Sequence, residues 1–153
     1  MGGGQQQLQQ LSQELQAIDQ EIEALEADIE RIQSEQSEID EAVEAIETLE
    51  TGSTVQVPLG GGAYVRAEVR DIDEVIVGLG GGYAAEQEQN DAIEVLHRKR
   101  DLLDQRIAEV RGEIEELEDE GDEIEQQAQE MQQQLQQQQM QQMQQLQGEG
   151  EDE

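Results

Sequence analysis

Gly78 and Gly80 are the residues whose spacing most resembles a site for chemistry. They follow the valine-rich run 75–77, and a Gly-x-Gly pair after a strand opens the fingerprint of dinucleotide-binding sites. The fingerprint needs a third glycine where this sequence has Tyr83. Glu86, soon afterwards, would repel a pyrophosphate. The spacing therefore indicates a hairpin turn, not a nucleotide site.

His97 is the only histidine, and it lies beside the basic residues at 98–100. The sequence has no cysteine and no second histidine, so neither a catalytic triad nor a His/Cys metal site can be assembled around it. We interpret this basic cluster as a partner for carboxylates such as Glu35 and Glu38 on a facing helix. The sequence therefore predicts no enzyme, no cofactor and no metal site.

The charge balance limits the possible partners. The 153 residues include 39 acidic and 8 basic side chains, giving a net charge of −31. Nucleic-acid binding requires a cationic face, so it is not expected, and anionic membrane surfaces would repel the chain. No apolar run approaches the ~20 residues of a membrane span, and we expect a soluble, cytoplasmic protein. The acidity could mark disorder or adaptation to a salt-rich cytoplasm, and the regular apolar spacing favours adaptation.

The central stretch of the chain, Val55–Tyr83, predicts the elements around which the rest is arranged. Its segment Val-Pro-Leu-Gly-Gly-Gly at 57–62 returns as Val-Gly-Leu-Gly-Gly-Gly at 77–82. Glycine adopts the positive φ angles that tight hairpins need, so each copy predicts a β-hairpin. We divide the chain into a first helix at 1–50, two hairpins at 51–84, a second helix at 85–140 and a Gln/acid-rich tail at 141–153.

Both flanking segments show heptad spacing of apolar residues, which is typical of a coiled coil. The seam positions of the first helix are Leu8, Leu11, Leu15, Ile18, Ile22, Leu25, Ile29, Ile32, Gln36, Ile39, Val43 and Ile46. One antiparallel register aligns this seam with that of the second helix. In that register the polar residue Gln36 meets Arg100, and the seam loosens where Leu15 faces Gly121 and Leu8 faces Ala128. The alternative is two helices that pair separately with other chains.

After Gln126 the sequence is mostly glutamine with scattered methionine and leucine. This segment is either a solvated low-complexity tail or an adaptable contact surface, since methionine side chains fit many shapes. The apolar residues at this end of the predicted helix pair are candidates for contact with other polypeptides: Leu8, Leu11, Leu15, Met131, Leu135, Met140, Met143 and Leu146.

The predicted strands carry one apolar face, which so few residues cannot bury alone. We expect both helices to extend away from one end of the strands and to leave this apolar face uncovered. The strands would then join those of other subunits in a closed β-barrel. The predicted interface residues are Val55, Val57, Leu59, Val65, Val69, Val75, Val77 and Leu79. The fold class is therefore α+β, a long antiparallel coiled-coil hairpin with two central β-hairpins that join an oligomeric barrel.

This pattern resembles the alpha subunit of archaeal prefoldin from Leu8 to about Leu135, most specifically in Val57–Gly62 and Val75–Tyr83. The resemblance implies a heterohexamer of two alpha and four beta subunits that captures unfolded polypeptides without ATP and transfers them to a group II chaperonin. The extreme acidity suggests a haloarchaeal source. The alternative function is a coiled-coil scaffold subunit that binds no client.

Overall fold

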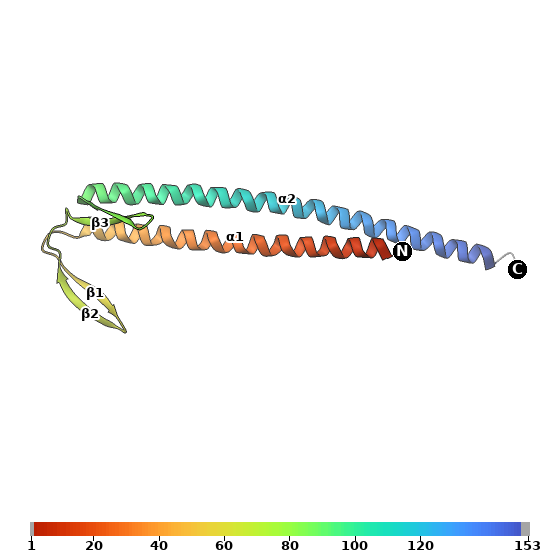
Figure 1. Cartoon of the computed structure of the whole chain (residues 1–153), viewed down its shortest axis with the longest axis horizontal. Helices are drawn as coiled ribbons and strands as arrows, with labels where there is room; N and C mark the ends of the chain where they lie inside the picture. Colours follow the sequence, from red (N-terminus) through yellow and green to blue (C-terminus); the bar gives the residue numbers. More distant parts are fainter. Residues whose placement is uncertain (1, 151–153) are drawn as a thin grey trace. The chain divides into compact units, whose positions relative to one another are not determined.

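The computed structural model describes residues 2–150 (Figure 1). The elements in chain order are α1 Gly2–Thr48, β1 Thr54–Gly60, β2 Ala63–Glu68, β3 Val75–Gly80, β4 Tyr83–Gln87 and α2 Gln89–Gly150. Two long helices therefore flank four short strands, which confirms the predicted α+β fold class.

The chain forms two compact units. Unit 1 comprises Met1–Asp28 and Glu109–Glu153, and unit 2 comprises Ile29–Ala108. Each unit thus contains one part of α1 and one part of α2, and unit 2 also contains all four strands.

The four strands form two separate antiparallel hairpins in unit 2. Val57 lies opposite Val65 in the first hairpin, and Val77 lies opposite Ala85 in the second. Gly60 and Gly80 begin the turns with φ angles of 100° and 93°, which side chains with a Cβ rarely adopt. The repeated glycine triplets are therefore hairpin turns, as predicted.

Gln36 marks a polar layer between α1 and α2 in unit 2. Its side chain is buried, and its amide nitrogen donates hydrogen bonds to the Arg100 backbone oxygen at 3.3 Å and to Asp104 Oδ1 at 2.6 Å. The Arg100 guanidinium forms an ion pair with Asp40, and its Nε lies 2.8 Å from Asp40 Oδ1. The predicted meeting of Gln36 with Arg100 is confirmed, but Gln36 contacts the backbone of Arg100 and not its charged group.

Two glycines in unit 1 show which residues of α1 and α2 lie opposite each other. A Cβ added at Gly121 would lie 3.8 Å from Ile18 Cγ2 and 3.9 Å from Leu15 Cδ2, so the predicted opposition of Leu15 and Gly121 is confirmed. A Cβ added at Gly4 would lie 2.8 Å from Leu135 Cδ2. The start of α1 therefore meets α2 near Leu135, and the antiparallel pairing leaves the rest of α2 without a partner on α1.

The second hairpin packs against the helices, and the prediction that they leave the strands uncovered is wrong for it. Val77 is 5% exposed and lies in a core cluster with Val43, Ala92 and Leu96. Lys99 adds a polar contact, because its Nζ donates a hydrogen bond to the Gly78 carbonyl oxygen at 2.8 Å. The hairpin is thus held by an apolar contact and by the single lysine, which was expected to offset carboxylates on α1.

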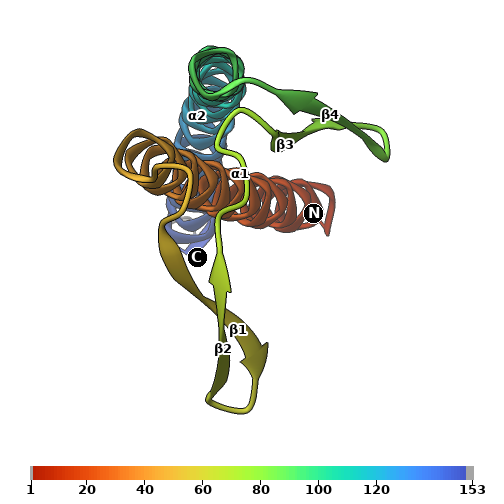
Figure 2. The same ribbon diagram turned by 90° about the vertical axis from the view of Figure 1, so that its left-hand side faces the viewer.

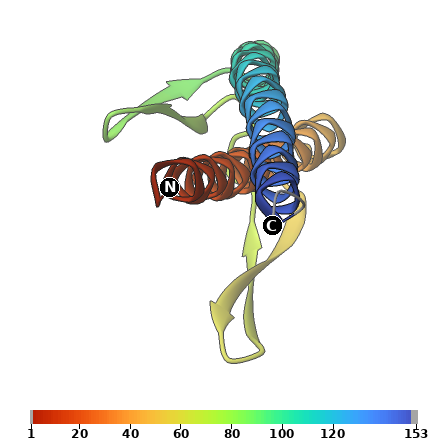
Figure 3. The ribbon, with the colours of Figure 1, turned by 90° about the vertical axis from the view of Figure 1, so that its right-hand side faces the viewer.

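The first hairpin is largely uncovered in unit 2. Val57 is 40% exposed, Leu59 68% and Val65 45%. Figures 2 and 3 show that hairpin β1–β2 and hairpin β3–β4 leave the helix ends in different directions. The first hairpin therefore matches the expected open apolar face, whereas the second buries Val77 and exposes Leu79 and Ile76.

The largest differences from the sequence-based division lie at the two ends of α2. Strand β4 continues to Gln87, so α2 begins at Gln89 instead of 85. The side-chain Nε2 of Gln89 donates a hydrogen bond to the Ile46 carbonyl oxygen in the last turn of α1. The segment expected as a separate tail from 141 is helical to Gly150. Glutamine is a good helix former, which explains the extension.

The different burial of the two hairpins predicts different costs of the same substitution. Val77→Ala should lower the free energy of unfolding by about 2 kcal/mol, because it leaves a cavity in the unit 2 core. Val57→Ala is the matched control and should cost about 0.5 kcal/mol or less. Urea unfolding of the isolated chain, followed by circular dichroism, measures both. Equal costs would contradict the packing of the second hairpin.

The polar layer predicts that Gln36→Leu stabilises the helix pair. Leucine adds apolar contact to the seam, while exposed Asp104 can bond to water in place of the lost amide, so we expect a gain of about 1 kcal/mol. Gln33→Leu, at an exposed position of α1, should change stability by about 0.5 kcal/mol or less. A lower melting temperature for Gln36→Leu would show instead that the amide contributes net stability.

Candidate binding surfaces

The residues considered for chemistry lie in elements that explain them structurally. Gly78 is inside β3 and Gly80 ends it, and the chain then returns as the antiparallel strand β4, not as a helix. His97 is exposed on α2. Among the described residues, no group of three or more His, Cys, Asp or Glu side chains is arranged to hold a metal ion. Exposed apolar surfaces are the remaining candidates for binding another molecule.

The candidate contact residues of unit 1 differ in exposure along α2. Met140 is 70% exposed, Met143 71% and Leu146 70%. Met131 and Leu135 are only half-buried, as are Leu8, Leu11 and Leu15 on α1. The three exposed residues lie beyond Leu135, where α1 supplies no covering side chains. The structure thus separates seam residues from residues that are free to contact another molecule.

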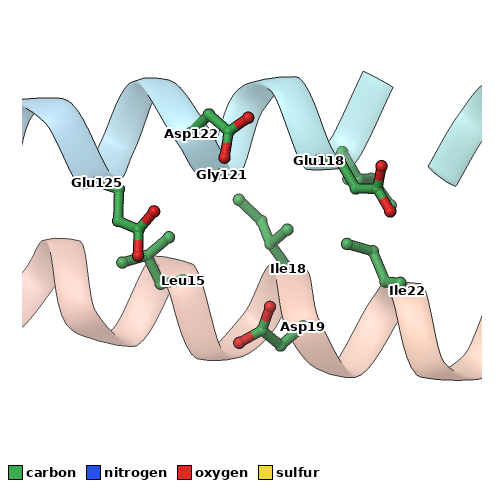
Figure 4. A pocket seen from close by; sticks show the side chains of 9 residues that line it. Leu15, Ile18, Asp19, Ile22, Glu118, Gly121, Asp122 and Glu125 are labelled. Carbon is green, nitrogen blue, oxygen red and sulfur yellow. The ribbon is translucent and has the colours of Figure 1, made fainter. Parts of the chain in front are cut away.

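A groove of about 210 Å³ lies on the seam of unit 1 beside Gly121. Figure 4 shows Leu15, Ile18 and Ile22 pointing from α1 toward α2, where Gly121 has no side chain to meet them. The remaining side chains around the groove include the carboxylates of Asp19, Glu118, Asp122 and Glu125. This acidic rim makes the groove a poor site for an apolar segment, because closing over it would dehydrate carboxylates.

A second groove lies nearer the start of α1, and glutamines from both helices line it. Its lining residues are Gln7, Gln10, Leu11, Glu14, Gln127, Glu130, Met131 and Gln134. Uncharged amides therefore replace most of the carboxylates found around Gly121. The sequence analysis identified Leu11 and Met131 here but not the glutamines around them, although the change in composition was visible.

The predicted subunit-interface residues fall into three classes of burial. Val57, Leu59, Val65 and Leu79 are exposed, Val77 is buried within its own chain, and Val55, Val69 and Val75 are half-buried. Their contact with another subunit stays a prediction. Sequence analysis missed other exposed apolar residues in unit 2, namely Tyr64 at 63%, Ile76 at 73%, Tyr83 at 77% and Leu102 at 63%. Ile76 could have been found, since it interrupts the alternation of β3 between Val75 and Val77.

The described residues also include no helix that is long and apolar enough to cross a membrane. Among the described residues, exposed apolar side chains lie on both hairpins and at Leu102 in unit 2, and on the last turns of α2 in unit 1. Such surfaces can bind polypeptides through apolar contact.

Comparison with known proteins gives these surfaces a context. A family model described as "Prefoldin subunit" matches residues 18–141. The prefoldin subunit alpha of Halorubrum lacusprofundi is 73% identical over 111 residues, which are 72% of this chain and 73% of that protein. Its counterpart from Halobacterium salinarum is 70% identical over 109 residues, 71% of each chain.

Among solved structures, a chain of filamentous PFD from Methanocaldococcus jannaschii is 32% identical, with a TM-score of 0.44 over 69% of this chain and 95% of that one. The matches with prefoldin alpha subunits of haloarchaea confirm the resemblance inferred from the hairpins and the seam. The family match and these identities together show that the chain belongs to the prefoldin family.

Proposed function

We propose that this chain is a subunit of an ATP-independent chaperone, which holds unfolded polypeptides and transfers them to a group II chaperonin. Membership of the prefoldin family supports a chaperone role. The observation that carries the proposal is the exposure of Met140, Met143 and Leu146 on α2, each 70% or more. Exposed apolar side chains in one place mark an interaction surface.

The chemistry of this surface suits clients of no fixed shape. Methionine has a flexible, polarisable side chain that adapts to irregular apolar partners. Two methionines and one leucine on one helix give only weak binding. Several subunits in one complex would raise the overall affinity through simultaneous contacts, without requiring any of the individual contacts to be strong.

We further propose that the first hairpin joins this chain to its partner subunits. The family resemblance suggests two alpha and four beta subunits around a β-barrel. Val57 and Leu59 project from the same face of β1 and are 40% and 68% exposed, and each strand of the hairpin has an open edge. Pairing with strands of other subunits would cover both the apolar face and the edges.

The competing function is a scaffold subunit that assembles but binds no client. Both functions use the hairpin surface, and only the chaperone uses the end of α2. The cytoplasmic location of this chain, like the transfer of clients to a chaperonin, stays a prediction.

The client-binding proposal predicts the effect of replacing the exposed residues of α2. The triple variant Met140→Gln, Met143→Gln, Leu146→Gln keeps good helix formers at each position but removes the apolar side chains. Protection of a chemically denatured client from aggregation, followed by light scattering, should then require about five times more chaperone or more. Leu102→Gln, which removes an exposed leucine from α2 in unit 2, should leave protection unchanged. Full protection by the triple variant would instead favour the scaffold function.

The assembly proposal predicts that charge on the apolar face of β1 prevents oligomerisation. The double variant Val57→Asp, Leu59→Asp would bury carboxylates in the interface, so we expect dissociated subunits in sedimentation velocity. Gln56→Asp places a carboxylate on the opposite face of the same strand and should leave the complex intact. If the double variant assembles like the unmodified protein, the first hairpin is not the interface.

A further inference from the structure

Outside the hairpin region, charged side chains are absent from two long stretches of this highly charged chain. Residues 1–13 and 131–148 contain no Asp, Glu, Lys or Arg, although the chain as a whole has 39 acidic and 8 basic residues. The contrast with residues 113–125 is sharp, since most of those are acidic. Glutamine is the commonest residue in both uncharged stretches.

Folding brings the two stretches together in unit 1. The contact between Gly4 and Leu135 joins them, and the second groove takes glutamines from both helices. Glu14 and Glu130 line the same groove and mark where charge begins on each helix. We call the surface formed by residues 2–13 and 131–148 the charge-free end. It includes Met140 and Met143, the most exposed methionines among the described residues.

Glutamines surround these methionines on the helix surface. Gln136 and Gln144 lie one turn from Met140, and Gln139 and Gln147 lie one turn from Met143, so each pair shares a helix face with its methionine. All four glutamines are exposed. Around Gly121, by contrast, the side chains that line the groove include four carboxylates.

The absence of charge changes what can be covered by a partner. A contact that covers carboxylates must remove their water, which costs free energy unless a positive charge compensates. An acidic partner offers little such compensation. The glutamine amide loses less on dehydration, and it can both donate to and accept from the peptide groups of an extended chain. A surface of methionine and glutamine can therefore accept a chain of the same negative sign as the protein itself.

We propose that the charge-free end binds unfolded segments of acidic polypeptides, and that its glutamines are the reason a chain with a net charge of −31 can do so. This inference rests on the proposed chaperone function and adds the class of client. The charge-free end selects clients by the apolar residues that they expose, and the charge of the client segments between those residues has little effect on binding.

The test measures binding of two fluorescent, unfolded peptides to the full chain by anisotropy, at about 1 M salt, where charge repulsion reaches only about 3 Å. The peptides share their apolar residues, and one carries glutamate wherever the other carries lysine. The unmodified protein should bind both with affinities within about threefold of each other. The variant Gln136→Glu, Gln139→Glu, Gln144→Glu, Gln147→Glu should bind the acidic peptide about tenfold more weakly and the basic peptide almost unchanged.

A matched variant controls for net charge. Gln16→Glu, Gln20→Glu, Gln33→Glu, Gln105→Glu adds the same four carboxylates at exposed positions outside the charge-free end and should leave both affinities unchanged. Circular dichroism checks that both variants stay helical. If the first variant binds the acidic peptide as tightly as the unmodified protein, or if the control weakens binding equally, the inference is wrong. If the unmodified protein binds neither peptide, the proposed chaperone function itself fails.

Discussion

The narrow apolar seam between α1 and α2 is the interaction on which each unit depends. Its buried residues include Ile18, Val110 and Ile124, and none of the buried side chains among the described residues is aromatic. A seam of this width excludes an enclosed pocket and leaves most side chains in water. Carboxylates cover the solvent-exposed faces of the helices, and their mutual repulsion opposes compaction of the chain. Function must therefore lie on exposed surfaces, where the seam ends or the chain leaves it.

The ends of the seam differ in a way that suits two kinds of contact. In unit 2 the helices end at strands, whose backbone edges can pair with another chain and whose apolar residues favour a permanent interface. In unit 1 α2 continues past its last contact with α1, and its exposed methionines favour weak and adaptable contact. Glutamine replaces carboxylate at this second place, which lowers the cost of covering it. The loss of an opposing helix beyond Leu135 accounts for the exposure of Met140, Met143 and Leu146.

The hairpins and the helix pairing could be predicted from the sequence, because short residue patterns specify them. The glycine triplets require hairpin turns, and the heptad spacing with Gln36 opposite Arg100 sets the antiparallel register. Packing of the second hairpin on the helices could not be predicted, since Val77 has the same alternation whether its face meets another subunit or Val43 of its own chain. The hydrogen bond from Lys99 to the Gly78 carbonyl oxygen could not be predicted either, because every residue has a backbone carbonyl and the sequence does not indicate which one a lysine will contact. The end of α2 was misplaced because low complexity was interpreted as a loss of structure, although glutamine favours helix.

The central claim is that the last turns of α2 hold the client, and methyl NMR tests it most directly. The chain has only 4 methionines, so labelling their methyl groups gives a simple spectrum with separate signals for Met131, Met140 and Met143. On addition of a permanently unfolded polypeptide, the account predicts shifts or broadening of the Met140 and Met143 signals and a smaller change for half-buried Met131. Unchanged Met140 and Met143 signals while the polypeptide is bound would contradict the account and place the client elsewhere on the chain.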